Sequence, residues 1–391
     1  MTLLKSNLIF FKTLLFFLFD SLALWNVSPK QKNKFELVLF VRQDAIGDYI
    51  LWLDTAKEYR KLFPPEKYKI TLVGNSLWCG LAKELPYWDE VVEVDVKRFK
   101  TFSRYRWKLL RQVKHLGAVI AVQPTYSREY YQGDALVRAS SAERKISSVG
   151  DMSNRNQLKQ ILADNWYTEL IPASPKLLTE LERNAEFFSG FSRTSYLTRS
   201  PKLNIPESWL SPDWKDKLFY VFVPGASTVW KEWPTSFFAN LAEKVHQQTG
   251  WGGIICGTQN EHVIAQQILN QCDVPLQNMA GQTELTDLAG LLSQSQLAIS
   301  NDSGAAHISA AIGTPTVCIL GGGHFGRFVP YPELPGHTNH LEVVYHKMSC
   351  YGCNWECVYT IKEGESAPCI TNVSVDAVWE KVKPLLINKT F

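Results

Sequence analysis

The sequence predicts an α/β protein with two Rossmann-like, doubly wound domains in series, preceded by a hydrophobic helix. Two observations predict this fold class. Short apolar strands alternate with helices from Phe35 onward, and the alternation starts again at Leu218 after a proline-rich stretch. Such alternation favours parallel sheets with helices on both faces. The length of 391 residues suffices for two domains of ordinary size.

The composition describes a folded globular chain. Hydrophobic residues make up 45% and charged residues 20% of the sequence. The net charge is only +3 and no long basic run occurs, which argues against bulk binding of nucleic acid. The 13 Trp, 15 Tyr and 20 Phe suit contacts with sugars or a membrane interface, and equally an aromatic core.

The first segment, residues 1–30, is predicted to be a membrane-associating helix. Residues 7–25 are strongly apolar but contain Lys12 and Asp20. Charges at the centre of a spanning helix cost a few kcal/mol each, by an order-of-magnitude estimate. On a helical wheel they fall on one side together with Thr13, which favours a helix lying in the membrane interface. A signal anchor and a helix packed on the protein's own surface remain alternatives.

The first domain, residues 31–205, is expected to be built around a parallel sheet. Its predicted strands cover residues 35–42, 69–74, 90–94 and 118–122. Helices are predicted between them, including residues 48–63 and 103–114, and Pro64 ends the first of these. Residues 154–214 are less regular and rich in proline, so we place the connection between the domains there.

The second domain, residues 206–391, repeats the alternation. Its predicted strands cover residues 219–223, 252–256, the surroundings of residue 276, 296–300 and 316–320. Its predicted helices cover residues 235–249, 261–270, 284–293 and 375–386, with one more starting after residue 303. The carboxyl ends of parallel strands meet at one edge of a sheet, so the loops after them are expected to face a cleft between the domains.

The strongest candidate site follows the strand at residues 296–300. Asp302 and Ser303 are predicted to cap a helix that carries His307, and Gly304 permits close approach to the backbone. The free N–H groups of the first turn would point at an anion such as a diphosphate. The alternative is a well-capped core helix without a ligand.

Three other loops carry candidate groups. Asp48 lies at a helix start, where the helix dipole keeps it ionised, so it could accept a proton from a hydroxyl or merely cap the helix. Lys231, between two tryptophans in the loop at residues 224–234, suits a phosphate. Glu261 follows a strand and could bind ribose hydroxyls, or simply favour a helix start.

Two further motifs remain open. Residues 321–326 satisfy the pattern G-x-G-x-x-G, but two prolines follow where a dinucleotide site needs a helix, so a flexible glycine loop lining the cleft is the better interpretation. Four cysteines lie close together in the sequence and could form a structural zinc site, a disulfide cluster or a set of reduced thiols: Cys350, Cys353, Cys357 and Cys369.

These loops, in this order, resemble glycosyltransferase family 9, the lipopolysaccharide heptosyltransferase family. The resemblance covers residues 35–386 and is carried by the stretches RQDAIGDYI, PGASTVWKEWP, NDSGAAHISAAIGTPTV and CYGCNWEC. It implies a GT-B fold, with acceptor binding in the first domain and donor binding in the second. It also implies inverting transfer of a sugar from a nucleotide donor, typically ADP-heptose. The implied acceptor is a glycolipid at the cytoplasmic face of the inner membrane, where the protein would be peripheral.

The resemblance also implies roles for single residues. Asp48 is similar to the base that deprotonates the acceptor, and Glu261 to the acid that binds the ribose. Asp302 resembles the residue that holds the donor sugar. The implied contacts to the donor phosphates are Ser227, Lys231, Ser303, Gly304, Ala305 and His307. No D-x-D motif occurs, which agrees with a transfer that requires no metal or other cofactor.

Some positions depart from the family pattern. Asp-Ser-Gly replaces the frequent Asp-Thr-Gly, Ala226 stands where some members have a hydroxyl residue, and residues 321–323 replace a Gly-Pro-type turn. Two other functions are therefore kept as alternatives. One is a nucleotide-sugar epimerase of similar two-domain build, and the other is a non-catalytic protein that binds sugar nucleotides.

Overall fold

A computed structural model describes residues 3–30, 34–334 and 340–387, and the chain forms two compact units. The first unit comprises Met1–Ala45, Asp54–Lys176 and Glu182–Thr198. The second comprises Ile46–Leu53, Leu177–Leu181 and Arg199–Phe391. From Arg199 onward the chain belongs to the second unit, and two earlier short segments, Ile46–Leu53 and Leu177–Leu181, belong to it as well.

The first unit contains a sheet of six parallel strands in the order β3-β2-β1-β4-β5-β6. These strands are β1 (Glu36–Arg42), β2 (Tyr68–Asn75), β3 (Glu90–Val94), β4 (Ile120–Gln123), β5 (Arg144–Ser148) and β6 (Glu169–Ile171). The four predicted strands are confirmed within two residues at each end, whereas β5 and β6 were not predicted.

Ten helical segments start in the part of this half of the chain that the structure describes. They are α1 (Leu3–Ala23), α2 (Ile46–Ala56), α3 (Tyr59–Leu62), α4 (Ser76–Lys83), α5 (Val96–Phe99), α6 (Arg104–Leu116), the π-helix η1 (Tyr130–Asp134), α7 (Ala135–Ser140), α8 (Gln157–Asp164) and α9 (Glu180–Ser192). The single helix predicted at residues 48–63 is wrong: it is α2 followed by α3. The N–H of Glu58 bonds to the carbonyl of Thr55, a tighter turn that interrupts the α-helical pattern.

The second unit contains another six-stranded parallel sheet, in the order β12-β11-β10-β7-β8-β9. Its strands are β7 (Phe219–Val223), β8 (Gly252–Ile255), β9 (Leu276–Asn278), β10 (Leu297–Asn301), β11 (Thr316–Ile319) and β12 (Leu341–Val344). Its main helices are α10 (Thr235–Thr249), α11 (His262–Leu269), α12 (Leu285–Gln294), α13 (Gly304–Ile312), α14 (Pro368–Thr371) and α15 (Val375–Ile387). Only β12 and the short α14 were not predicted.

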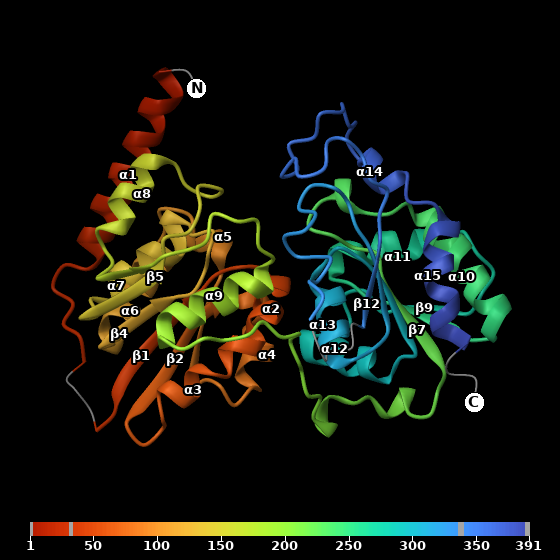
Figure 1. The fold of residues 1–391 in the computed structure, drawn as a ribbon, viewed down its shortest axis with the longest axis horizontal. Helices are drawn as coiled ribbons and strands as arrows, with labels where there is room; N and C mark the ends of the chain where they lie inside the picture. Colours follow the sequence, from red (N-terminus) through yellow and green to blue (C-terminus); the bar gives the residue numbers. More distant parts are fainter. Residues whose placement is uncertain (1–2, 31–33, 335–339, 388–391) are drawn as a thin grey trace. The chain divides into compact units, whose positions relative to one another are not determined.

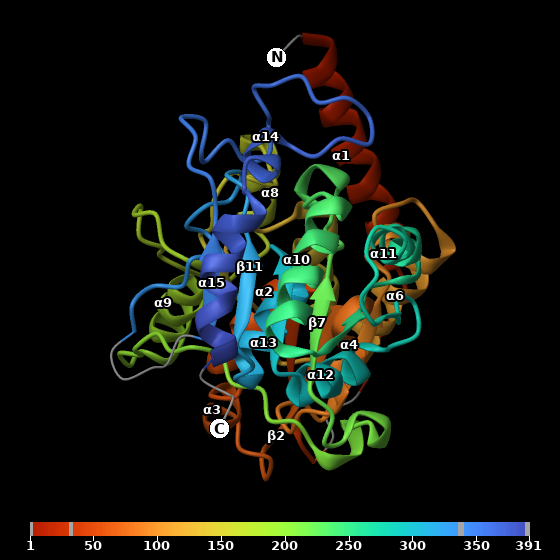
Figure 2. The ribbon, with the colours of Figure 1, turned by 90° about the vertical axis from the view of Figure 1, so that its right-hand side faces the viewer.

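Helices cover both faces of the second sheet. Figures 1 and 2 show α10, α11 and α15 on one face and α12 and α13 on the other. All five residues of β7 are buried, as the unbroken apolar run of a strand covered on both sides requires. Helix α13 ends at Gly313, whose φ of 97° places it in the left-handed region that ends a helix without a Cβ penalty. The predicted α/β, doubly wound fold class is therefore confirmed.

Both sheets reverse their strand order beside their first strand. In the second unit the reversal lies between β7 and β10, which are hydrogen-bonded neighbours although two other strands separate them in the sequence. In open α/β sheets, ligands bind outside the carboxyl ends of the strands at such a reversal. The loops after β7 and β10 therefore flank the position where the second unit is expected to bind a ligand.

The N-terminal helix α1 directs its polar side chains into the first unit. Asp20 is 4% exposed and accepts hydrogen bonds of 2.7 and 2.5 Å from the buried guanidinium of Arg106, and Thr13 shares a hydrogen bond with the hydroxyl of Tyr131. The opposite side of α1 exposes its apolar side chains, among them Leu8, Phe11, Leu15, Leu18 and Leu22. Among the helices that the structure describes, none combines the length and the hydropathy that crossing a membrane requires.

Candidate active site

The loop after β7 is tied to the end of β10 by a buried asparagine. The side chain of Asn301 donates to the carbonyl of Pro224 and accepts a hydrogen bond of 3.2 Å from the N–H of Trp233. Asn301 is fully buried, so these bonds are shielded from water. This asparagine holds the loop that carries Ser227 and Lys231 beside the residues that follow β10.

The start of α13 leaves its amides open to a ligand. Ser303 is the N-cap residue, as predicted, but its side chain makes no capping hydrogen bond and instead lies 3.0 Å from the hydroxyl of Ser300. A helix start without such a cap keeps unsatisfied N–H groups and a partial positive charge. Ser303 and Gly304 are partly exposed, whereas Ala305 is buried. This geometry suits an anion at the first turn of α13.

Lys231 and Asp302 are oppositely charged groups of this site that influence each other's protonation. Burial lowers the pKa of the Lys231 ammonium, and the charge of Asp302 opposes that shift. Burial likewise raises the pKa of Asp302, and Lys231 opposes it. Lys231 ends the short 3₁₀ helix η4 (Val229–Lys231) and is partly exposed, and Ser227, just before this helix, is exposed. The structure thus brings together the lysine and the aspartate that the sequence predicted for the donor site.

Glu261 lies over the loops that follow β7 and β8. It ends the 3₁₀ helix η5 (Gln259–Glu261), and its carboxylate accepts a hydrogen bond from the N–H of Thr258 in a capping box. A Cβ atom added at Gly225 or Gly257 would lie 2.5 or 2.9 Å from the Glu261 side chain, so only glycine leaves room there. Glu261 is partly exposed, so it can both cap its helix and meet a ligand.

Asp48 lies in the first turn of α2 and is partly exposed. This turn belongs to the second unit and packs against the start of α13. A Cβ atom added at Gly304 would lie 2.7 Å from Cβ of Ile46, and one added at Gly47 would lie 3.8 Å from Cα of Gly304. The two glycines therefore allow two helix starts to approach closely, which brings the predicted base and the predicted anion site into one unit.

His307 is buried rather than open to a ligand. It is 3% exposed, and its Nδ1 shares a hydrogen bond of 2.8 Å with the hydroxyl of Tyr331. Burial lowers the pKa of the His307 imidazole to about 4, so the ring is neutral at pH 7. His307 consequently offers no positive charge to a diphosphate in this structure.

The glycine run at residues 321–323, which the sequence suggested as a flexible loop lining the cleft, is packed against aromatic rings. All three glycines are buried, and added Cβ atoms would lie 2.6, 2.4 and 2.4 Å from the rings of Trp355, Tyr351 and Trp355, respectively. The backbone of the cysteine-bearing segment, residues 350–369, bonds to this run: the N–H groups of Gly352 and Asn354 donate to the carbonyls of Gly322 and Gly323. The aromatic rings of that segment leave no room for a side chain at these three positions, which explains why they are glycines.

The same segment contacts the loop of Lys231. The N–H of Ala367 donates to the carbonyl of Trp230, and the hydroxyl of Ser366 donates to the carbonyl of Glu232. The Lys231 ammonium lies 4.5 Å from the centroid of the Trp355 ring. His324 is bonded to Asn354 at 2.7 Å, and the positive charges of Lys231 and Arg327 help to lower its pKa, although burial is the largest cause.

The four clustered cysteines are free thiols. Cys369 is buried, and this burial raises the pKa of its thiol. The charges of Cys350, Cys353 and Cys357 raise that pKa further. Within the described residues, no three His, Cys, Asp or Glu side chains are placed as a group that could hold a metal ion. Of the three alternatives that the sequence left open, the structure thus shows reduced thiols, because the four cysteines form neither a disulfide nor a group that could hold a metal.

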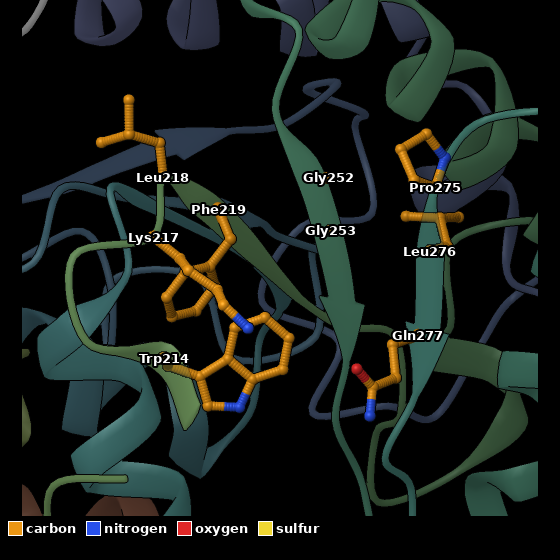
Figure 3. A pocket seen from close by; sticks show the side chains of 9 residues that line it. All are labelled: Trp214, Lys217, Leu218, Phe219, Gly252, Gly253, Pro275, Leu276 and Gln277. Carbon is orange, nitrogen blue, oxygen red and sulfur yellow. The ribbon is translucent and has the colours of Figure 1, made fainter. Parts of the chain in front are cut away.

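A pocket of about 430 Å³ lies elsewhere in the second unit. Figure 3 shows Trp214, Lys217 and Phe219 on one side of it and Leu276 and Gln277 on the other. These residues lie at the amino ends of the strands, at the edge of the sheet opposite to Asp302. None of the predicted site residues lines this pocket.

Sequence reasoning assigned no role to Asn301, Trp355 or His324. Asn301 could have been noticed as a polar residue at the end of an otherwise apolar strand. The other two lie in CYGCNWEC and in residues 321–326, but these stretches do not indicate the partners of the two side chains, which lie far away in the sequence.

Comparisons with known proteins agree with this architecture. A sequence profile of glycosyltransferase family 9 (heptosyltransferase) matches residues 160–350. The chain is 35% identical over 305 residues to lipooligosaccharide heptosyltransferase 2 of Haemophilus ducreyi, which covers 71% of this chain and 80% of that protein. It is 22% identical over 295 residues to lipopolysaccharide heptosyltransferase 3 of Escherichia coli K12, covering 73% and 83% of the two chains.

Solved structures share the fold. The glycosyl transferase family 9 structure from Veillonella parvula superposes with a TM-score of 0.69 at 18% identity, covering 91% of this chain and 98% of that one. The E. coli ADP-heptose lipopolysaccharide heptosyltransferase II superposes with a TM-score of 0.65 at 16% identity, covering 91% and 100%. The chain therefore belongs to glycosyltransferase family 9, the heptosyltransferases, and is a glycosyltransferase.

Proposed function

We propose that this enzyme transfers a heptose from ADP-heptose to a lipopolysaccharide-type or other surface-glycan acceptor, with inversion of the anomeric centre and without a metal ion. The observation that carries the proposal is the arrangement in the second unit. There, Asp48, the uncapped start of α13 and the Lys231–Asp302 pair belong to one compact body. One solved relative, E. coli WaaC, bears ADP-2-deoxy-2-fluoro heptose in its structure, which supports the choice of donor.

In this reaction the carboxylate of Asp48 accepts the proton of an acceptor hydroxyl. The hydroxyl oxygen forms the new bond to the anomeric carbon while the bond from that carbon to the phosphate oxygen breaks, and ADP leaves with both electrons. Attack from the face opposite the leaving group inverts the anomeric centre. A general base in position contributes about 10² to 10⁴ in rate, so Asp48 would carry much of the chemical step.

The leaving diphosphate is stabilised by fixed positive groups. The N–H groups at the start of α13 and the Lys231 ammonium are set in place before the reaction, so they need no reorganisation as charge develops. These groups supply the positive electrostatic potential that a metal ion supplies in other transferases. In this proposal the ribose donates hydrogen bonds to Glu261, and the packing of that side chain over Gly225 and Gly257 supports the assignment.

We further propose that the protein works on the inner face of the inner membrane, and that the exposed apolar face of α1 lies on the lipid. Leu8 is 71% exposed and Leu15 is 55% exposed, although a helix docked on a globular unit normally buries such residues. Exposed apolar faces of this kind mark contacts with membranes or partners. A glycolipid acceptor would reside in that same bilayer.

The decisive experiment is a transfer assay with the full chain, ADP-heptose and a heptose-deficient lipopolysaccharide acceptor. Wild type should release ADP and extend the acceptor, also in the presence of EDTA. Asp48→Ala should lose about 10² to 10⁴-fold in turnover while it still binds ADP. An epimerase would convert the donor without acceptor, and a binding protein would give no product. Thermal shifts with ADP, UDP, GDP and CDP would identify the base, since only a bound nucleotide stabilises the fold.

A further inference from the structure

We infer that His307 is a positioning residue: its imidazole lies between Tyr331 and Gly47 and fixes the first turn of α2, and thereby the carboxylate of Asp48. This inference rests on the proposed function, because it assigns to Asp48 the proton transfer described above. It differs from the expectation that His307 contacts the donor diphosphate.

One edge of the His307 imidazole contacts Gly47. A Cβ atom added at Gly47 would lie 2.8 Å from Cδ2 and 3.4 Å from Nε2 of His307. At 2.8 Å a side chain and a Cβ atom cannot coexist without a shift, so the ring edge is packed on the backbone of α2 itself. Gly47 immediately precedes Asp48, so a backbone fixed at Gly47 also fixes the Cα of Asp48.

The other side of the His307 ring contacts Tyr331. Nδ1 of His307 is bonded to the Tyr331 hydroxyl at 2.8 Å, and the two rings are nearly parallel, with an interplanar angle of 17°. Tyr331 packs in turn against the cluster formed by Ala306, Cys318, Leu320, Val329 and Leu341. The imidazole is therefore held by the core of the second unit on one side and touches α2 on the other.

The starts of α2 and α13 approach each other closely. Gly304 opens α13 and faces Ile46 and the N–H of Gly47, where its added Cβ atom would lie 2.7 and 3.3 Å away, respectively. His307 lies one turn further along α13. Two contacts one turn apart on α13 thus define both the position and the direction of the start of α2. That explains why Ile46–Leu53 belongs to the second unit while β1, the strand before it, belongs to the first.

Activity alone does not distinguish a positioning role of His307 from a role in binding the donor diphosphate. A residue that binds the diphosphate contributes to ADP affinity, whereas a residue that places Asp48 contributes to the rate of transfer after the donor is bound. A displacement of about 1 Å of a catalytic group can cost on the order of 10²-fold in rate. The ratio of kcat loss to loss of ADP affinity is therefore the measurement that separates the two roles.

The experiment compares five variants of the full chain with wild type. Gly47→Ala and His307→Ala test the two sides of the contact, and their double variant tests whether the sides act together. His307→Asn can keep a polar partner for Tyr331 but removes the ring edge that touches Gly47. Gly80→Ala is the matched control, since Gly80 also lies in a helix and an added Cβ atom there meets nothing within 4 Å. Each variant is measured for kcat, for the Kd of ADP and for melting temperature.

We expect kcat to fall by on the order of 10²-fold in Gly47→Ala, His307→Ala and His307→Asn, with the Kd of ADP changed less than about threefold. The double variant should lose less than the product of the two single losses, because one added methyl group occupies part of the space the imidazole leaves. Gly80→Ala should match wild type in all three quantities.

Two results would overturn the inference. One is a Kd for ADP that rises more than about tenfold in His307→Ala while Gly47→Ala transfers sugar at the wild-type rate. The other is strict additivity of the Gly47→Ala and His307→Ala effects on both kcat and melting temperature. If wild type transferred no sugar, the proposed function would fail and the catalytic role of His307 with it. Coupled melting temperatures would then still establish the contact, which keeps the two failures distinguishable.

Discussion

The ammonium of Lys231 lies 4.5 Å from the centre of the Trp355 ring, so the face of an indole supports the lysine predicted to bind the donor phosphates. A cation over an aromatic face is stabilised by about 0.5–2 kcal/mol, more when water is excluded. Trp355 itself rests on Gly321 and Gly323, which have no side chains to obstruct the ring. The cysteine-bearing segment thus helps to fix the position of Lys231.

Replacing Trp355 by leucine should therefore weaken the binding of the donor more than it slows the chemical step. Leucine keeps an apolar contact with the glycines but offers no π-face to the ammonium, so the KM for the donor should rise by about two- to thirtyfold. Steady-state kinetics with varied ADP-heptose would measure it. Trp214→Leu is the control, because Trp214 lines the pocket at the opposite edge of the sheet. Equal effects of the two substitutions would show that Trp355 has no special relation to the donor.

The Lys231–Asp302 pair predicts how donor binding depends on pH. Burial lowers the pKa of Lys231 and the charge of Asp302 raises it again, so Asp302→Asn should lower that pKa further. The ammonium then loses its proton at a lower pH, and the alkaline weakening of ADP binding should begin earlier than in wild type. Calorimetric titration of ADP between pH 7 and 10 would show the shift.

Lys231→Arg provides the matched comparison for this pH dependence. A guanidinium keeps its proton throughout that range, so ADP binding by this variant should lose the alkaline limb, whatever its absolute affinity. An alkaline limb that persists in Lys231→Arg would assign the titration to another group.

Most of the fold was predictable because its strands are apolar runs bounded by turn residues. The strands that were missed lack that signal. β5 reads RKISS and begins with two charged residues, β6 has only three residues, and β12 is four residues long with a glutamate in its middle. Such short strands, of which β6 and β12 lie at sheet edges, form because a neighbouring strand offers hydrogen bonds, and these contacts cannot be inferred from the local sequence.

Those site residues that follow a strand were predictable from the sequence. The orientation of side chains that depends on contacts with residues remote in the sequence was not. Asp48, Lys231, Glu261 and Asp302 all follow strands at the carboxyl edge, where the fold class alone leads one to search. The direction of His307 could not be read in the same way. A residue in the first turn of α13 can face an anion or the core. His307 faces the core, where its ring contacts Gly47, a residue remote in the sequence.

The burial of His307 predicts a loss of stability in acid. Its pKa falls from the ordinary value of 6.5 to about 4 on folding, so between these values the unfolded chain binds a proton that the folded chain does not. Stability should thus decline as the pH drops from 6.5 towards 4, by on the order of 3 kcal/mol from this group. Urea midpoints at pH 7 and pH 5 would measure the decline.

His307→Asn is the variant that isolates this effect, since an amide does not titrate. Its midpoint should be lower than that of wild type at pH 7 but should fall less between pH 7 and pH 5. Parallel declines in the two proteins would mean that other groups cause the acid sensitivity.

Helix α1 predicts binding to lipid through a face opposite to its polar contacts. Asp20 and Thr13 hold the helix to the first unit. Leu15 and Leu18 are 55% and 49% exposed, so Leu15→Glu and Leu18→Glu should leave the fold intact. Burying a leucine in an apolar phase gains about 1.5–3 kcal/mol, so each substitution should reduce partitioning into lipid tenfold or more. Cosedimentation with vesicles of phosphatidylethanolamine and phosphatidylglycerol measures that partitioning.

Leu177→Glu and Leu197→Glu are matched controls, because these leucines lie outside α1 and are 83% and 76% exposed. If the α1 substitutions instead left lipid binding unchanged and dissociated an oligomer in light scattering, a second copy of the chain would be what covers this face.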